Sequence, residues 1–292
     1  MGGYSARYHA ASLAAVFLAL AIGILIGVGF GDDVVSGTTE DLEQSLRDDV
    51  QDARQLAEER SRAIDREQEF ADSAYPALVG GDLRGRDVAL IALGSLDPAL
   101  ADDVEAAIEP AGGDLVEVAV VREPPDLDAL ANDLRGTRHA RVKRNPDALE
   151  TLGRAAGRQL VLGGGLVRKI RDQLLSRFSG RAIGADDVVV TRGTPRDAGR
   201  KAEDATDRLQ NGILDGIKSV DRPTVGVERT DAEESAIELF ESHEISTVDD
   251  LDLIAGQVAM VSVLGGAEGS FGVKDTADGL LPDLLHPLRR ER

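Results

Sequence analysis

Side chains that could carry catalysis or hold a metal ion are few in this chain and lie far apart. There is no cysteine, so disulfides and thiolate metal sites are excluded. The four histidines, His9, His139, His243 and His286, occur singly, without the spacing of a metal site or of a catalytic triad. No serine lies in a G-x-S-x-G motif. We therefore expect no active site and predict that the chain is not an enzyme.

Three consecutive glycines, Gly163, Gly164 and Gly165, precede an expected helix, where a phosphate could bind at the helix N-terminus. They lack the G-x-G-x-x-G spacing and the lysine of a phosphate-binding loop, so we interpret them as a tight turn. Adjacent aspartates occur at 102–103, 186–187 and 249–250. Chance produces such pairs in a chain this acidic, and we assign them no catalytic role.

The composition is strongly acidic. The 292 residues include 53 Asp and Glu against 33 Lys and Arg, a formal net charge of −20. A field of this sign repels nucleic acid and anionic lipid, so we expect no nucleic-acid partner.

The longest uncharged stretch covers residues 10–30. As a helix it would be about 31 Å long, close to the hydrocarbon thickness of a bilayer. A cleaved signal peptide is an alternative, because Ala19-Leu20-Ala21 resembles a cleavage site, and a buried core helix is another. The apolar run is about twice as long as that of a usual signal peptide. We therefore predict a single membrane-spanning helix over residues 10–30.

The charges that flank this stretch suggest an orientation. Arg7 precedes it, whereas Asp32 and Asp33 follow it. The positive-inside rule then predicts a cytoplasmic tail over residues 1–9. The resulting topology is a single-pass protein of the cell membrane, with most of the chain outside the cytoplasm.

Small residues recur at every fourth position of the same stretch. Ridges of this kind let helix backbones approach closely in lipid. We predict self-association through this ridge; an Ala- and Gly-rich composition is the alternative explanation. The ridge consists of Ala15, Ala19, Gly23, Gly27 and Gly31.

Residues 36–75 read as a charged helical stalk. The segment is rich in Glu, Asp, Arg, Gln, Leu and Ala, and Pro76 with the Gly80-Gly81 pair is expected to end it. A coiled-coil seam passes through Leu42, Leu46 and Leu56, but charged residues interrupt it. The seam predicts a homo-oligomer, a protein partner of the cell envelope, or both, with a solvated stalk as the alternative.

Residues 82–292 alternate strands with helices, which predicts a layered α/β domain with a mostly parallel sheet. Short apolar runs suit buried parallel strands. We expect strands at 87–93, 114–121, 187–191 and 223–227. Helices are expected at 98–109, 126–134, 146–157, 166–178, 201–218 and 232–242. The last apolar block, 253–264, fits a helix or a strand.

Two segments resemble one known family. The first reads HAASLAAVFLALAIG, and the second is the glycine-rich SVLGGAEGSFGVKDTADGLLPDLL near the C-terminus. Both are similar to the corresponding segments of the MctB-like copper transporter family of actinobacteria. The matching positions are His9, Ser12, Leu13, Val16, Phe17, Leu18, Ala19, Leu20, Ile22, Gly23, Gly269, Gly272, Lys274, Asp275, Gly279, Leu281 and Pro282.

The resemblance implies a role in copper export or homeostasis, within an assembly. Family members are also linked to the cell envelope and the division machinery, so a scaffold whose coiled coil recruits a partner is the alternative. Copper would be a transported or sensed ion, and we expect no resident cofactor. His139, His243 and Met260 are the candidate copper ligands, since imidazole and thioether groups suit copper.

Overall fold

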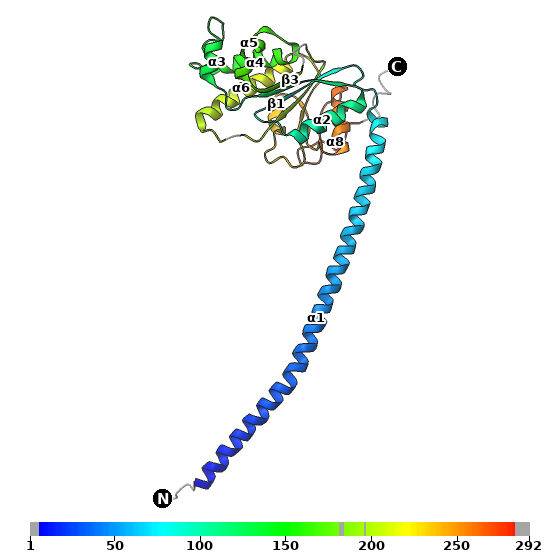
Figure 1. Cartoon of the computed structure of the whole chain (residues 1–292), viewed down its shortest axis with the longest axis vertical. Helices are drawn as coiled ribbons and strands as arrows, with labels where there is room; N and C mark the ends of the chain where they lie inside the picture. The colour runs from blue at the N-terminus through cyan, green and yellow to red at the C-terminus, as the bar shows by residue number, and fades with distance from the viewer. Residues whose placement is uncertain (1–5, 181–183, 196, 284–292) are drawn as a thin grey trace. The chain divides into compact units, whose positions relative to one another are not determined.

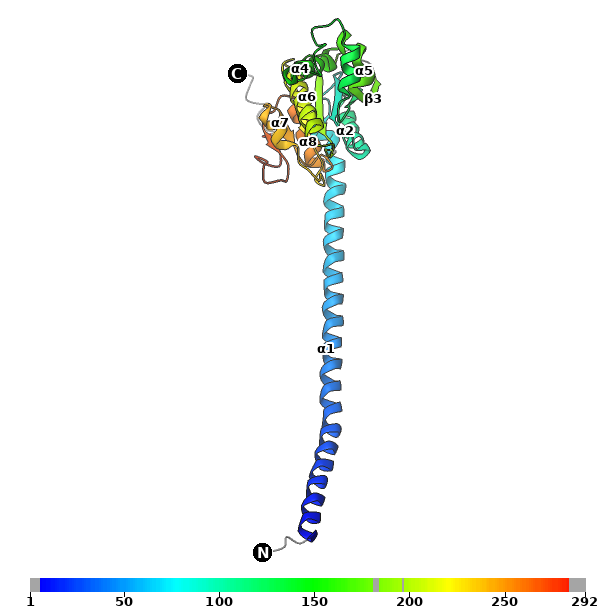
Figure 2. The same cartoon turned by 90° about the vertical axis from the view of Figure 1, so that its left-hand side faces the viewer.

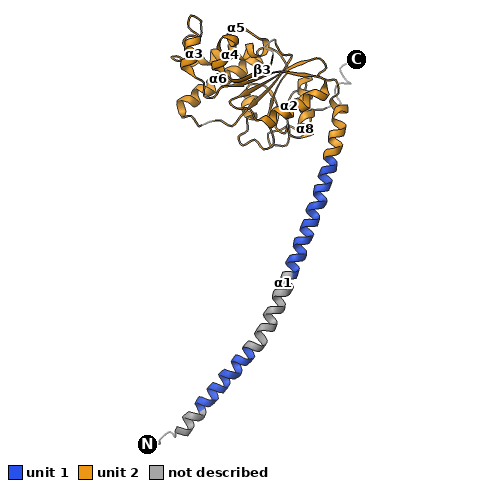
Figure 3. Cartoon of the chain, in the orientation of Figure 1, with its two compact units in different colours: residues 1–67 blue, residues 68–292 orange. Residues whose placement is uncertain are grey.

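The computed structural model describes residues 6–180, 184–195 and 197–283, with the side chains of residues 6–11 and 28–43 left out. Two compact units cover residues 1–67 and 68–292 (Figure 3). The elements, in chain order, are α1 (Ala6–Val79), β1 (Asp87–Leu93), α2 (Pro98–Ala111), β2 (Asp114–Val121), α3 (Leu127–Asp133), α4 (Pro146–Leu162), α5 (Gly165–Leu174), β3 (Leu175–Gly180), β4 (Asp187–Arg192), α6 (Arg200–Lys218), β5 (Thr224–Val227), α7 (Ile237–Ser242), β6 (Ser246–Val248), α8 (Ile254–Leu264) and β7 (Ser270–Phe271).

The second unit is built on a seven-stranded sheet with the strand order β3-β2-β1-β4-β5-β6-β7. All neighbouring strands are parallel except β3, which runs antiparallel to β2. The central strands are apolar on both faces and buried, as parallel strands covered by helices must be. This confirms the predicted α/β domain with a mostly parallel sheet.

Helices cover both faces of this sheet (Figures 1 and 2). Alternate residues of one strand point to opposite faces, so Val188 and Val190 of β4 join one hydrophobic cluster and Val189 joins the other. The first cluster includes side chains of α3, α4, α5, α6 and α7. The second includes the end of α1, α2 and α8.

α4 and α6 approach each other through glycines. A Cβ on Gly157 would lie 2.1 Å from the carbonyl oxygen of Ile213, and one on Gly216 would lie 2.3 Å from that of Arg154. Because only hydrogen atoms fit at these positions, the two helix backbones pack against each other directly.

The last turns of α1 belong to the core of the second unit. Tyr75 is 4% exposed and donates a hydrogen bond of 2.8 Å to the carbonyl oxygen of Ala107 in α2. Val79 is buried in the same cluster. Pro76 was expected to break the helix, but α1 continues through it to Val79, where Gly80 and Gly81 follow in a turn.

The prediction of a membrane-spanning helix over residues 10–30 is wrong. The part of the chain that the structure describes contains no helix that is both long enough and apolar enough to cross a bilayer. These residues form the beginning of α1, a 74-residue helix that runs on into the charged segment.

The predicted single-pass topology depends on that helix and is therefore not supported either. The tail over residues 1–9 and Gly31 lie outside the fully described residues. Ala15, Ala19, Gly23 and Gly27 are exposed on α1, and a Cβ on either glycine would meet no atom within 4 Å. Self-association through this ridge stays a prediction.

Three strands were not predicted. β3 follows α5 directly, where the sequence predicts that the helix continues to residue 178. β6 and β7 have three and two residues, too few to show a period. The block 253–264, left open between helix and strand, is helix α8.

Candidate functional site

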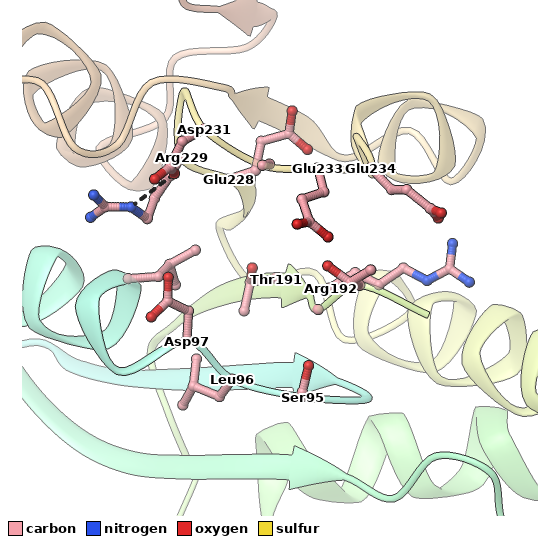
Figure 4. Close-up of a pocket in the computed structure, with 14 residues that line it drawn as sticks. Ser95, Leu96, Asp97, Thr191, Arg192, Glu228, Arg229, Asp231, Glu233 and Glu234 are labelled. Carbon is pink, nitrogen blue, oxygen red and sulfur yellow. Dashed lines mark hydrogen bonds and ion pairs between the residues drawn. The ribbon is translucent and has the colours of Figure 1, made fainter. Parts of the chain in front are cut away.

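The candidate site is a crevice at the carboxyl ends of β1, β4 and β5 (Figure 4). The chain passes from β1 to β2 on one side and resumes with β4 on the other side of β1. Open α/β sheets bind their ligands at such a switch point, outside the carboxyl ends of the strands. The crevice has a volume of about 290 Å³.

Hydroxyl groups lie on the floor of the crevice, at the end of one strand and just after another. Thr191 is the penultimate residue of β4 and is only 3% exposed. Ser95 follows β1 and faces the crevice beside it (Figure 4). Gly193 allows this close approach, since a Cβ there would lie 2.0 Å from the Ser95 Oγ.

Carboxylates dominate the walls. Five acidic residues and two arginines, Arg192 and Arg229, line the crevice. Figure 4 shows the Glu233 side chain directed across the crevice toward the strand that carries Thr191. The acidic residues are Asp97, Glu228, Asp231, Glu233 and Glu234.

Arg229 is already paired. Its guanidinium donates to the Asp103 carboxylate and, through Nε, to Asp231 Oδ1 at 3.2 Å. Burial raises the pKa of Asp103, and the adjacent Arg229 charge opposes this rise. The ion pair therefore joins the loop after β5 to α2 and leaves little positive charge for a ligand.

Glu228 is a buried anchor of the same wall, with 3% of its surface exposed. Its carboxylate accepts hydrogen bonds from the Ser235 hydroxyl at 2.7 Å and the Ala236 amide at 2.8 Å. Lys274 completes the shell with an ion pair. Lys274 is held by Asp249, whose carboxylate accepts its backbone amide and that of Val273. The glycine-rich segment near the C-terminus thus stabilises the crevice wall through the ion pair between Lys274 and Glu228.

A neighbouring carboxylate, that of Asp250, has an unusual environment. Asp250 is completely buried, and neither side-chain oxygen has a hydrogen-bond partner. Burial, and then the charges of Asp249 and Asp252, raise the pKa of Asp250 to about 6. This carboxyl group therefore takes up a proton in mildly acidic solution.

The sequence-predicted copper ligands are not brought together. His139 lies between α3 and α4, is 4% exposed and accepts a hydrogen bond of 3.0 Å from Arg138. Burial, with the Arg138 charge, lowers the pKa of His139. Met260 is completely buried in α8.

His243 follows α7 and contacts α6. Its Nδ1 lies 2.9 Å from Asp215 Oδ1, and its Nε2 lies 3.1 Å from Asn211 Oδ1. Within the described residues, no three His, Asp or Glu side chains gather in a way that could hold a metal ion.

The glycine run is the turn between α4 and α5. Gly163 has a φ of +74°, and the Gln159 side chain accepts the amide of Leu166 at 2.8 Å. The N-terminus of α5 is therefore occupied by a side chain of the protein, as expected for a tight turn.

The coiled-coil positions are only partly described. Leu46 and Leu56 are 54% and 49% exposed on α1, whereas the Leu42 side chain lies outside the description. The predicted seam through these leucines stays a prediction.

Sequence reasoning missed the crevice residues. Ser95, Thr191 and Glu228 belong to no motif, and each follows or ends a strand that the sequence does predict. The strand ends were an available signal, but the strand order that makes them neighbours is set by tertiary pairing.

Comparison with known proteins gives a consistent result. The family model described as "Copper transport outer membrane protein, MctB" matches residues 4–282. Proteins named copper transporter MctB from Mycobacterium bovis and Mycobacterium tuberculosis are 30% identical over 322 aligned residues, covering 92% of this chain and 96% of the relative. The match confirms the resemblance found in the sequence and favours copper transport over the scaffold alternative. The chain therefore belongs to the MctB family of copper transport outer membrane proteins.

Proposed function

We propose that this protein acts in copper export or copper homeostasis in the cell envelope, as part of an assembly. The observation that carries the proposal is the family match over residues 4–282, supported by relatives named as copper transporters that cover 92% of the chain. Nothing in the described residues or the family description indicates a catalytic reaction. In this proposal copper is the transported or sensed ion.

The chemistry of the available side chains limits how this protein would meet copper. Thiolates are absent from the sequence, and the thioether of Met260 is completely buried. Among the described residues, accessible oxygen and imidazole donors remain, and these suit Cu(II) better than Cu(I). Of the two histidines whose side chains are described, His243 offers a side chain with 12% exposure beside Asp215.

An experiment in cells tests the role in copper handling. We would measure total intracellular copper and zinc in a strain that lacks this gene and in the complemented strain, both grown with added copper. The proposal predicts that copper rises several-fold without the gene, that zinc does not change, and that the gene restores the normal level. Unchanged copper, or an equal rise of both metals through general envelope damage, would overturn it.

A titration of the full-length protein tests direct contact. A ligand that binds only the folded state raises the melting temperature. We expect Cu(II) to raise it saturably, and the effect to disappear in His243→Ala while the buried His139→Ala variant keeps it. If zinc raises the melting temperature equally, or His243→Ala responds like the parent, His243 is not a copper ligand.

The assembly part of the proposal rests on α1. Its exposed leucines, Leu46 and Leu56, would bury apolar surface against another helix. Sedimentation of the full-length protein tests this. Leu46→Ser with Leu56→Ser should lower the assembly state, whereas Gln51→Ser with Gln55→Ser, away from the seam on the same helix, should not. Equal sedimentation of both variants and the parent would contradict the seam.

A further inference from the structure

The crevice floor carries a hydroxyl group that has no hydrogen-bond partner among the described residues, that of Thr191. The Thr191 hydroxyl points into the crevice in Figure 4, although the residue is only 3% exposed. None of the residues that the structure describes forms a hydrogen bond with this hydroxyl. The hydroxyl oxygen is not one of the fully buried side-chain atoms and is open to the crevice. The Thr191 hydroxyl is therefore placed to bond a ligand.

The charge around this hydroxyl is mainly negative, with five acidic residues and two arginines in the lining. Arg229 is paired with Asp103 and Asp231. Arg192 lies 3.7 Å from the Asp207 carboxylate outside the crevice, and its buried Nε has no hydrogen-bond partner among the described residues. Glu233 and Glu234 line the crevice, are exposed, and form no ion pair within the described residues. A positively charged group entering the crevice would thus meet carboxylates that have no other partner.

The crevice is poorly suited to phosphates, although its strand order resembles that of dinucleotide-binding domains. In those domains the helix after the first strand directs free amides at the phosphate. Here the first turn of α2 is filled by the protein itself, because the Asp97 side chain accepts the Ala99 amide at 2.9 Å and Pro98 has no amide hydrogen. The loop after β1 also lacks the glycine pattern.

A bare metal ion fits the crevice less well than a molecule. Within the described part of the chain, no group of three acidic or histidine side chains is placed to share one ion. The volume of about 290 Å³ lies near the lower end of the range for small-molecule sites. The occupant should therefore carry its positive charge on an organic group.

We propose that the crevice binds a small organic cation through an ammonium or guanidinium group. The Thr191 hydroxyl accepts a hydrogen bond from this group at the floor of the crevice. Glu233 and Glu234 neutralise its charge from the opposite wall, and a carboxylate is the strongest acceptor for such a donor. This site is independent of the copper function proposed above.

Calorimetric titration of the full-length protein with spermidine tests the proposal. Salt of about 0.15 M reduces non-specific attraction to the acidic surface, because the Debye length is then about 8 Å. We expect saturable binding with a stoichiometry near one, and no binding of ADP. Binding of ADP in preference to spermidine, or no saturable heat up to about 10 mM spermidine, would overturn the proposal.

Matched variants locate the binding. Glu233→Gln with Glu234→Gln should weaken spermidine binding at least about tenfold, and Thr191→Val should weaken it about fivefold. Glu238→Gln with Glu241→Gln removes the same number of charges from exposed positions of α7 and should leave the affinity unchanged. If both double variants bind alike, the attraction comes from the general surface charge and the crevice is not the site. Circular dichroism confirms that each variant is folded.

Discussion

Gly193 and Ser95 are in contact at the floor of the crevice, where β4 and β1 end side by side. A Cβ on Gly193 would lie 2.0 Å from the Ser95 Oγ and 2.6 Å from the Ser95 carbonyl oxygen. The hydroxyl can rotate away, but the carbonyl oxygen belongs to the backbone. The width of the crevice floor therefore depends on the absence of a side chain at position 193.

Replacing Gly193 with alanine should deform this floor. We expect Gly193→Ala to lower the melting temperature and to weaken spermidine binding about tenfold, because the loop after β1 must move. Gly165→Ala is the control, since a Cβ at Gly165 meets no atom within 4 Å. Unchanged binding and stability in Gly193→Ala would show that the loop accommodates the methyl group.

The glycine contacts between α4 and α6 predict a larger loss of stability. In Gly157→Ala the new methyl group would lie 2.1 Å from the Ile213 carbonyl oxygen, so the two helices must separate. We expect the free energy of unfolding to fall by about 3 kcal/mol, measured by urea denaturation. Gly165→Ala, in the open first turn of α5, should change it by less than about 1 kcal/mol. Similar values for both variants would contradict direct backbone packing.

The ion pair between Lys274 and the buried Glu228 predicts that loss of the lysine lowers the stability of the fold. Lys274→Met leaves a buried carboxylate with only two hydrogen bonds, from Ser235 and Ala236. We expect a loss of about 2 kcal/mol, and partial recovery when Glu228→Gln is added. Lys201→Met, at an exposed position of α6, serves as the control. A loss of the same size in Lys201→Met would point to a general charge effect.

The buried Asp250 predicts a specific dependence of stability on pH. Its pKa rises from the ordinary 3.8 to about 6 in the folded protein. Below about pH 4 Asp250 is mostly protonated in both the folded and the unfolded state, so its titration no longer changes the stability. Between about pH 4 and 6 the unfolded state releases its proton first, so stability falls as pH rises and then stays low.

Asp250→Asn should remove this penalty. The variant should gain about 1–3 kcal/mol over the parent protein at pH 8, and little at pH 4. Urea denaturation at both values measures the difference. Asp275→Asn, at an exposed position, should show no such gain. A loss of stability in Asp250→Asn at pH 8 would mean that the charged carboxylate is favourable in the fold.

The predictable part of this fold is the part whose pattern is local. β1 and β4 are unbroken apolar runs, and the helix at 98–109 carries a capping Asp97 and Pro98 in its first turn, so sequence alone places them. From the sequence, β3 is predicted as a continuation of α5. The reason is that Leu166, Ile170 and Leu174 keep a helical period up to the start of β3. Only its pairing with β2 makes it a strand. The crevice depends on strand order in the same way, which explains why Thr191 carried no signal of its own.

The junction between α1 and α2 has a mechanical consequence. Tyr75 donates a hydrogen bond to the Ala107 carbonyl oxygen and Val79 is buried. The end of the long helix is therefore part of the hydrophobic core. A tension applied along α1 is therefore resisted by the packing of the domain interior and not by a surface loop. A chain that begins at residue 82 lacks Tyr75 and Val79, two of the side chains that close this core. Its domain would therefore lose this resistance to tension.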